Sequence, residues 1–202
     1  ILDGLSPDRR AAADHGELLF GTIDTFLIWH LTGGAHHGVH VTDVSNASRT
    51  MLMDLATLDW DAGICEELGI PPVMLPEIRG SSEVYGTGGF DLDGVPIAGD
   101  LGDQQAALFG QTCFEAGQVK CTYGTGSFLL VHTGDQPARS THGLLTTVAL
   151  AHPDGRRDYA LEGSVFVTGA AIQWLRDGLG IIDHAAQTQD LAGSVPDSGG
   201  VV

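Results

Sequence analysis

The sequence has little basic charge and a single lysine, Lys120. Nine lysine and arginine residues face 26 acidic residues in a chain of 202, which gives a formal net charge of −17 at pH 7. Such a chain repels polyanions, so nucleic acid and an anionic membrane surface are excluded as expected partners. A substrate that carries phosphate can still bind through backbone amides, a helix N-terminus or a bound cation.

Long apolar runs and paired cysteines are also missing. The longest uninterrupted apolar stretches, such as 26–29 and 128–131, fall far short of the ~18 residues that a membrane span needs. The three cysteines, Cys65, Cys113 and Cys121, form no C-x-x-C motif. An odd and unpatterned set of cysteines predicts reduced thiols in a cytoplasmic protein without a membrane span.

The sequence does contain enough apolar residues for a core. Hydrophobic residues make up 43% of the chain and charged residues 17%, which excludes wholesale disorder. Segments with strand and helix patterns are mixed throughout, which predicts an α/β fold. The pattern changes near 112–117, so we expect one domain over residues 1–111 and another over 112–202. The missing initiator methionine and the strand-like end at 200–202 favour an internal piece of a longer polypeptide.

Local signals predict most of the secondary structure. Ser6 followed by Pro7 predicts a helix that runs to Asp14. Further helices are expected at 23–31 (buried), 61–68, 103–109 and 164–179, and strands at 39–42, 95–98, 118–122, 128–132, 144–150 and 158–161. Residues 46–53 are expected to lead into a second extended segment. Glycine-rich turns at 123–127 and 153–155 predict two hairpins.

Asp103 is the first candidate catalytic residue, because it stands where a predicted strand gives way to a helix. Ligands of α/β proteins gather at the carboxyl ends of strands and at helix N-termini. The plain alternative is that Asp103 only caps its helix. Gly99 and Gly102 leave room for a ligand in the preceding turn. Gln104 and Gln105 add neutral hydrogen-bonding groups that suit a hydroxylated substrate.

Two segments with glycine are candidates for contact with a nucleotide. The run 122–127, TYGTGS, is either an ordinary hairpin turn or a phosphate cradle, in which backbone amides and the Thr125 hydroxyl approach an anion. It is not a P-loop, because the lysine and the following helix are missing. Gly169 falls inside the predicted helix 164–179, where glycine costs roughly 1 kcal/mol relative to alanine. It permits either close helix packing or the approach of a flat ligand to which Gln173, on the same face, donates.

No metal site is predicted. His36, His37 and His40 have no carboxylate or cysteine at ligand spacing, so we expect them in a solvated loop. The acidic residues between 91 and 100 lack the spacing of an EF-hand.

Together these segments resemble the FGGY family of carbohydrate kinases, and within it the members that phosphorylate glycerol. The stretches that carry the resemblance are 16–29, 39–51, 81–86, 102–111, 122–128, 143–147 and 159–177, in order over nearly the whole chain. The resemblance implies an actin-like fold of two ribonuclease-H-like lobes around a cleft, with both lobes partial here. Residues 1–111 would complete the first lobe, and residues 112–202 would begin the second. The implied activity is transfer of a phosphoryl group from ATP to glycerol, giving glycerol 3-phosphate.

The resemblance also assigns roles to single residues. Asp103 would be the general base, Gln104 would bind the polyol beside it, and Phe128 would pack on the carbon skeleton of the polyol. The residues expected to line the ATP site are Thr125, Gly126, Gly169 and Gln173. ATP and Mg²⁺ are the implied cofactors. The full-length protein is expected to form a homo-oligomer, a dimer or a tetramer.

Parts of the family pattern are missing from the chain. The first phosphate-binding hairpin, an Arg-Glu pair and the aromatic residues that hold glycerol should precede Ile1, and a glycine-rich adenosine site should follow Val202. The family's regulatory loop for fructose 1,6-bisphosphate would fall at 87–94, which reads TGGFDLDG without arginine or lysine, so this regulation is not expected. Two alternatives stay open: an FGGY kinase for another polyol or a sugar, and an actin-like nucleotide-binding module without kinase activity.

Overall fold

The computed structural model describes residues 2–201, except for the side chain of Phe90. The chain forms two compact units. Unit 1 runs to Lys120 and resumes at Leu130–Glu162, and unit 2 comprises Cys121–Leu129 and the chain from Gly163 onward. Helices and strands are mixed in sequence, as the α/β prediction requires.

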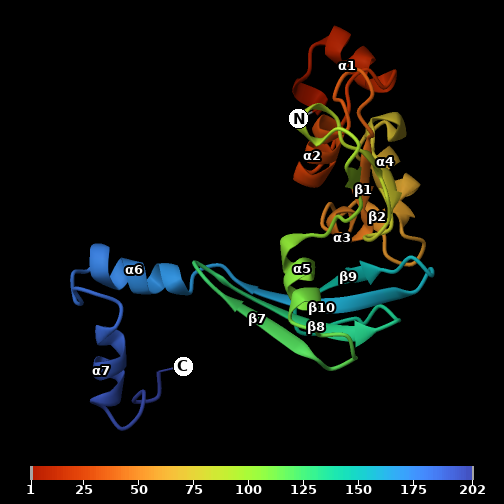
Figure 1. Ribbon diagram of the computed structural model, residues 1–202. Coiled ribbons are helices and arrows are strands. Elements are labelled where there is room, and N and C mark those ends of the chain that lie inside the picture. The colour runs from red at the N-terminus through yellow and green to blue at the C-terminus, as the bar shows by residue number, and fades with distance from the viewer. Residues whose placement is uncertain (1, 202) are drawn as a thin grey trace. The chain divides into compact units, whose positions relative to one another are not determined.

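The first part of unit 1 consists of short elements (Figure 1). They are α1 (Pro7–Asp14), α2 (Ile23–Leu31), β1 (Val41–Asp43), α3 (Val44–Ala47), β2 (Met53–Asp54), β3 (Asp59–Trp60), α4 (Ala62–Glu67), β4 (Glu77–Arg79), β5 (Gly86–Thr87), β6 (Pro96–Ile97) and α5 (Asp103–Gly110). β1 and β4 pair in parallel, whereas β2 with β3 and β5 with β6 pair antiparallel. Ser6 caps α1 through its hydroxyl, which accepts a hydrogen bond from the Arg9 amide, as the Ser-Pro signal predicts.

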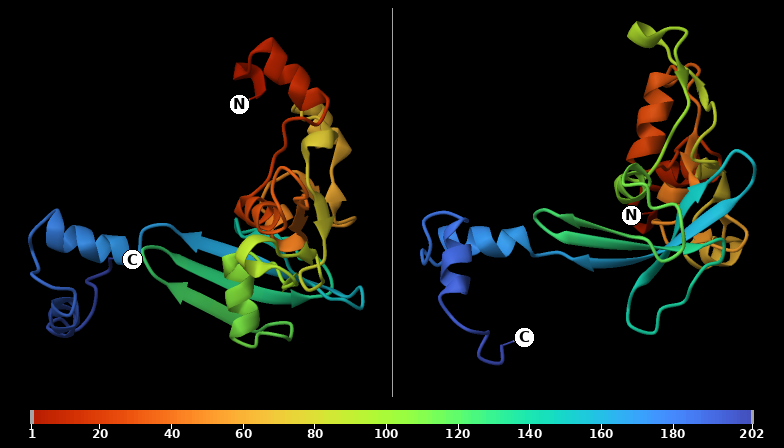
Figure 2. Two further views of the ribbon diagram at one scale, coloured as in Figure 1. Left: turned by 45° about the horizontal axis from the view of Figure 1, so that its top comes forward. Right: turned by 60° about the horizontal axis from the view of Figure 1, so that its bottom comes forward.

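A four-stranded sheet follows, in the order β7-β8-β10-β9. Its strands are β7 (Val119–Tyr123), β8 (Ser127–Gly134), β9 (Leu145–Ala151) and β10 (Arg157–Val165). Within unit 1, α5 lies on this sheet (Figures 1 and 2), and Leu108 of α5 packs against Leu130, Ala149 and Ala160 in a buried cluster. The hydrophobic core therefore fixes the helix that begins at Asp103.

The segment after β1 contains a helix that the sequence analysis did not include. Residues 44–47 form α3, and the extended segment into which 46–53 was expected to lead begins with β2 at Met53. The Asp43 side chain caps this helix by accepting hydrogen bonds from the backbone amides of Ser45 and Asn46. Val44 and Ala47 then face Val148 of β9 in a buried cluster. Packing against a strand more than 100 positions further along the chain thus stabilises a helix that is too short to form on its own.

Two helix predictions need a correction. α2 has the predicted bounds but is only partly buried, because Ile28 is enclosed while Ile23 and Phe26 are 70% and 54% exposed. The helix expected at 164–179 begins later, because β10 continues to Val165 and α6 spans Gly169–Asp177. Gly169 is therefore the first residue of its helix rather than an interior one.

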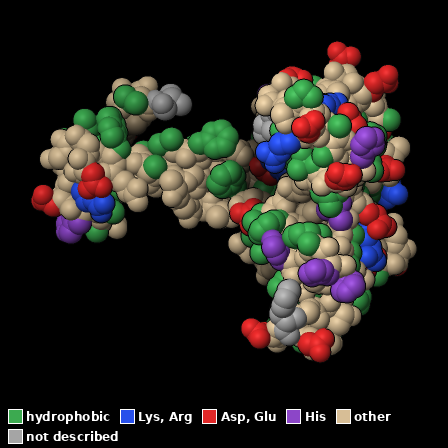
Figure 3. Space-filling model, turned by 90° about the horizontal axis from the view of Figure 1, so that it is seen from above, with side chains coloured by type: hydrophobic (Ala, Val, Ile, Leu, Met, Phe, Trp, Pro, Cys, Tyr) green, Lys and Arg blue, Asp and Glu red, His purple; other side chains and the backbone are tan. Residues whose placement is uncertain are grey.

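Unit 2 contains the turn between β7 and β8, α6 and a second helix, α7 (Gln187–Gly193). None of the helices formed by residues 2–201 combines the length and apolar character that a membrane crossing requires. Acidic side chains are scattered over the face seen in Figure 3 rather than gathered into one patch.

Candidate active site

Asp103 is the first residue of α5 and lies at the surface of unit 1. Gly102 occupies the N-cap position, so Asp103 is not the N-cap residue of α5. The Asp103 carboxylate accepts hydrogen bonds from the Gln104 amide at 2.9 Å and from the Gln104 side-chain nitrogen at 3.1 Å. It therefore still satisfies one free amide of the first turn while most of the side chain faces solvent.

Gln104 links Asp103 to a buried charge. Its side-chain oxygen accepts a hydrogen bond from Nζ of Lys120 in β7. Lys120 is 1% exposed, so the only lysine of the chain is enclosed beside the candidate base. The two contacts of the Gln104 amide fix its orientation, with the nitrogen toward Asp103 and the oxygen toward Lys120.

The turn before Asp103 holds a second carboxylate, Asp100. Burial raises the pKa of Asp100 to about 8, and the neighbouring carboxylates of Asp43 and Asp24 add to the rise. One of its oxygens accepts a hydrogen bond from the Asn46 side chain at 3.2 Å, whereas the other is buried without a partner among the described residues. This turn therefore carries a carboxyl group that holds its proton to a higher pH than an ordinary aspartate does.

The predicted nucleotide residues come together in unit 2, with the exception of Gln173. The backbone amides of Thr168 and Ala170 donate to the carbonyl of Thr125, and the amide of Gly169 donates to the carbonyl of Gly124, at 2.9–3.1 Å. The start of α6 is thus bonded directly to the hairpin turn (Figure 1). Amides 168–170 are engaged in these bonds, so any phosphate cradle must use amides of the hairpin itself.

Two glycines at this junction leave no room for a side chain. A Cβ atom on Gly169 would lie 2.4 Å from the carbonyl oxygen of Gly124, and one on Gly126 would lie 2.7 Å from the carbonyl oxygen of Val165. Close packing by itself explains why both positions are glycine. The role of Gly169 in nucleotide binding stays a prediction.

The surroundings of this turn still leave polar groups for a ligand. The hydroxyls of Ser127 and Thr168 are buried and have no hydrogen-bond partner among the described residues. Buried hydroxyls without partners are rare in folded proteins, which fits a polar ligand at this junction. Thr125 and Gln173 are exposed, and Phe128, the second residue of β8, is partly buried.

A cation site is not formed by the described part of the chain. No group of three histidine, cysteine or acidic side chains within residues 2–201 is placed to hold a metal ion. The expectation of Mg²⁺ therefore rests on the family resemblance and not on ligands in this segment.

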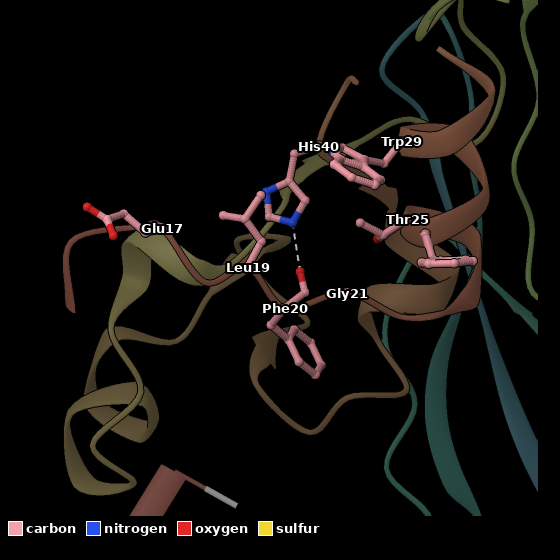
Figure 4. Close-up of a pocket in the computed structure, with 8 residues that line it drawn as sticks. Glu17, Leu19, Phe20, Gly21, Thr25, Trp29 and His40 are labelled. Carbon is pink, nitrogen blue, oxygen red and sulfur yellow. Dashed lines mark hydrogen bonds between the residues drawn. The ribbon is translucent and has the colours of Figure 1, made fainter. Parts of the chain in front are cut away.

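A separate hollow lies beside α2 (Figure 4). It has a volume of about 380 Å³ and is lined mainly by apolar side chains. The lining residues are Glu17, Leu19, Phe20, Gly21, Thr25, Phe26, Trp29 and His40. His40 approaches the Phe20 carbonyl oxygen to 2.7 Å, so it has a structural partner here. The hollow includes none of the residues predicted to bind polyol or nucleotide.

Sequence reasoning missed three residues at the site: Asp43, Asp100 and Lys120. The pattern of Asp43 followed by Ser45 and Asn46 is typical of a helix start and could have indicated α3. Lys120 was distinguished only as the single lysine. The contact of Lys120 with Gln104 depends on strand placement, which the sequence does not reveal.

Comparisons with known proteins identify the family of the chain. The chain matches the N-terminal domain of the FGGY family of carbohydrate kinases over residues 4–110 and the C-terminal domain over residues 119–202. A protein of Chloroflexus aggregans named glycerol kinase is 59% identical over 201 residues, and one of Thermotoga maritima named glycerol kinase 2 is 60% identical over 203 residues. Both alignments cover 100% of this chain and 40% of the relative.

The solved structures give the same result. The crystal structure of Plasmodium falciparum glycerol kinase with ADP superposes with a TM-score of 0.87 at 38% identity, over 97% of this chain and 39% of that one. The fold is that of part of a carbohydrate kinase with the actin-like ATPase fold. The chain belongs to the FGGY family of carbohydrate kinases, as the sequence resemblance predicts. It spans about two fifths of the length of the curated relatives it matches.

Proposed function

We propose that this chain is the central part of a kinase that transfers the γ-phosphoryl group of ATP to glycerol and forms glycerol 3-phosphate. The observation that carries the proposal is the exposed carboxylate of Asp103, held at the start of a helix that the core fixes and oriented by Gln104. The 59–60% identity to proteins named glycerol kinase supports glycerol as the acceptor.

In the proposed reaction, Asp103 accepts the proton of a glycerol hydroxyl. The hydroxyl oxygen bonds to the γ-phosphorus while the bond from that phosphorus to the β–γ bridging oxygen breaks, and ADP leaves. Phosphoryl transfer needs mainly positioning and charge neutralisation, to which Mg²⁺ contributes when it is bound with ATP. Lys120 keeps the Gln104 amide turned toward Asp103, so the amide also stands next to the incoming polyol.

The remaining contacts are proposed from the family and from the geometry of unit 2. Phe128 packs on the carbon skeleton of the polyol. The nucleotide contacts are made by Thr125, Gly126, Gly169 and Gln173. The unpartnered hydroxyls of Ser127 and Thr168 support a polar ligand at this turn. We also propose that residues 1–111 and 112–202 belong to different lobes of the complete enzyme, that it is cytoplasmic, and that it forms a dimer or a tetramer.

Two other functions compete with this proposal. An FGGY kinase for another polyol or a sugar would use the same base, and a nucleotide-binding module without kinase activity would need no Asp103 at all. The identity to glycerol kinases over the whole chain favours the first proposal over both. ADP release by the complete enzyme should depend on added glycerol; equal release without an acceptor would favour the nucleotide-binding module.

The decisive variant is Asp103→Asn in the complete enzyme. Asparagine has nearly the same shape and can still accept a hydrogen bond from the Gln104 amide, but it cannot act as the base. General-base assistance is worth ~10²–10⁴ in rate, so kcat should fall at least ~100-fold with ATP binding nearly intact.

Asp8→Asn is the matched control, because Asp8 is also exposed in the first turn of a helix, α1. It should leave kcat unchanged. An Asp103→Asn enzyme that keeps more than about a tenth of the wild-type kcat ends the base assignment, because even the low end of the general-base range exceeds that loss.

A further inference from the structure

A cluster of buried polar side chains surrounds Asp43, which is 0% exposed. One carboxylate oxygen accepts hydrogen bonds from the Ser45 hydroxyl at 2.8 Å, the Asn46 amide at 2.8 Å and the Asn46 side chain at 2.9 Å. The other accepts from the Ser45 amide at 3.1 Å and from the Ser81 hydroxyl at 2.7 Å. Asp43, Ser45, Asn46 and Ser81 are called the Asp43 cluster below. With five donors on one carboxylate, the side chains of this cluster have little freedom to move.

The Asp43 cluster reaches the turn that leads into α5 through three bonds. The Ser45 hydroxyl accepts from the backbone amide of Gly102 at 2.8 Å. The Asn46 side chain donates to Asp100 at 3.2 Å, and the Asp100 amide donates to the Ser81 carbonyl at 3.1 Å. The cluster thus holds the turn at both Asp100 and Gly102, directly before Asp103.

These bonds matter because the Asp103 side chain is exposed and has few other restraints. Within residues 2–201, its hydrogen-bond donors are the backbone and side-chain nitrogens of Gln104, its neighbour in the chain. The position of the carboxylate therefore follows the position of the backbone at Gly102. A displacement of a reacting group by about 1 Å can cost ~100-fold in rate.

We propose that Ser45 is a positioning residue for catalysis. Its hydroxyl donates to buried Asp43 and accepts from the Gly102 amide, and so holds in place the turn that presents Asp103. The inference rests on the proposed role of Asp103 as the base. Ser45 touches neither polyol nor nucleotide in this account, and acts only through the Gly102 amide. Burial raises the pKa of Asp43 above its ordinary value, although hydrogen bonds from the Asn46 amide, the Ser81 hydroxyl, and the hydroxyl and amide of Ser45 act in the opposite direction.

The test is Ser45→Ala in the complete enzyme, with Ser48→Ala as the matched control. The Ser48 hydroxyl lies at the end of the same helix, donates to the Ser45 carbonyl and lies 2.8 Å from the Thr147 hydroxyl; within residues 2–201 no hydrogen bond joins it to the turn before Asp103. Ser45→Ala should lower kcat ~10-fold or more, since the Gly102 amide loses its acceptor and the turn can shift. The KM for ATP should stay unchanged. Ser48→Ala should keep the wild-type kcat.

A double-mutant cycle separates positioning from a general loss of structure. If Ser45 acts through Asp103, Ser45→Ala should cost no further kcat in an enzyme that already carries Asp103→Asn. An equal loss of kcat in both backgrounds, or a loss no larger than that of Ser48→Ala, would overturn the inference. Failure of the base assignment is seen separately, in the Asp103→Asn enzyme alone.

If Ser45→Ala does not fold, Asn46→Ala is the variant to test. Asn46→Ala removes the side-chain bonds to Asp43 and Asp100 at a partly buried position and leaves the backbone cap of α3 in place. It should lower kcat in the same way and lose this effect in the Asp103→Asn background. A folded Asn46→Ala enzyme with the wild-type kcat would contradict the inference.

Discussion

Replacing Gly169 by alanine separates a packing role from a nucleotide-binding role at the junction of α6 with the hairpin turn. The new Cβ atom would lie 2.4 Å from the carbonyl oxygen of Gly124, and the neighbouring backbone at Thr125 lies 3.7 Å away. Real Cβ atoms essentially never come closer than 3.0 Å, so the helix and the hairpin must separate by at least about 0.6 Å. The Gly124 carbonyl also accepts the Gly169 amide at 3.0 Å, so the same shift lengthens that hydrogen bond.

This overpacking sets the expected magnitude. Inserting a methyl group into a site without space typically costs ~1–3 kcal/mol. For a domain of about 150–250 residues, each kcal/mol lowers the melting temperature by ~2–4 °C, so the variant should melt ~2–12 °C lower. Because the hairpin moves as well, the KM for ATP should rise more than the KM for glycerol.

Gly193→Ala is the matched control. Gly193 is the last residue of α7, also in unit 2, and a Cβ atom there would meet nothing within 4 Å. The control should melt at or slightly above the wild-type temperature, since alanine is favoured over glycine in a helix. Both variants are to be compared in the complete enzyme by thermal unfolding and steady-state kinetics.

Three results are possible, and each has a different meaning. A Gly169→Ala enzyme with the same melting temperature as the Gly193→Ala control and with the wild-type KM for ATP would refute the steric argument. A lower melting temperature with an unchanged KM for ATP would make Gly169 a packing glycine only. A selective rise in the KM for ATP is the result expected if the junction also binds the nucleotide.

Three further predictions follow from charge and exposure. Burial and the neighbouring carboxylates of Asp43 and Asp24 raise the pKa of Asp100 to about 8. The folded state therefore binds this proton more tightly than the unfolded state, and the protein should lose stability as the pH rises from about 4 through 8. Asp100→Asn should flatten this part of the stability profile; identical melting curves of variant and wild type at pH 6 and pH 9 would contradict the shift. Millimolar fructose 1,6-bisphosphate should leave the kinase rate unchanged, because the loop 87–94 contains acidic residues and no cation, and clear inhibition would show that other residues bind it. Residues 1–202 expressed alone should aggregate or be inactive, because α2 and α6 expose large apolar side chains; a monodisperse, fully active monomer would disprove this.

The sequence by itself determined those elements whose signals lie within a few residues. Ser6 and Pro7 define the start of α1, and the glycine-flanked turn before Asp103 predicts the start of α5 at the observed residue. The hairpin of β9 and β10 turns at 153–155 as expected, because the residues that favour such a turn are adjacent in the chain. The runs that resemble the FGGY family also gave the fold class, since they extend in order along the chain.

Only the tertiary structure decided the bounds of elements that depend on pairing or packing with a distant segment of the chain. β10 pairs within the sheet and continues to Val165, so α6 begins only at Gly169. Gly169 therefore lies at the start of a helix, where it packs closely against the hairpin turn, and not in the interior of a helix. The short helix α3 exists because Asp43 caps it and because Val44 and Ala47 pack against β9. The link from Lys120 to Gln104 and the bonds from the Asp43 cluster to the turn before Asp103 join residues 16 to 57 positions apart. Contacts of this kind depend on how the core brings the elements together, and local sequence signals carry no information about them.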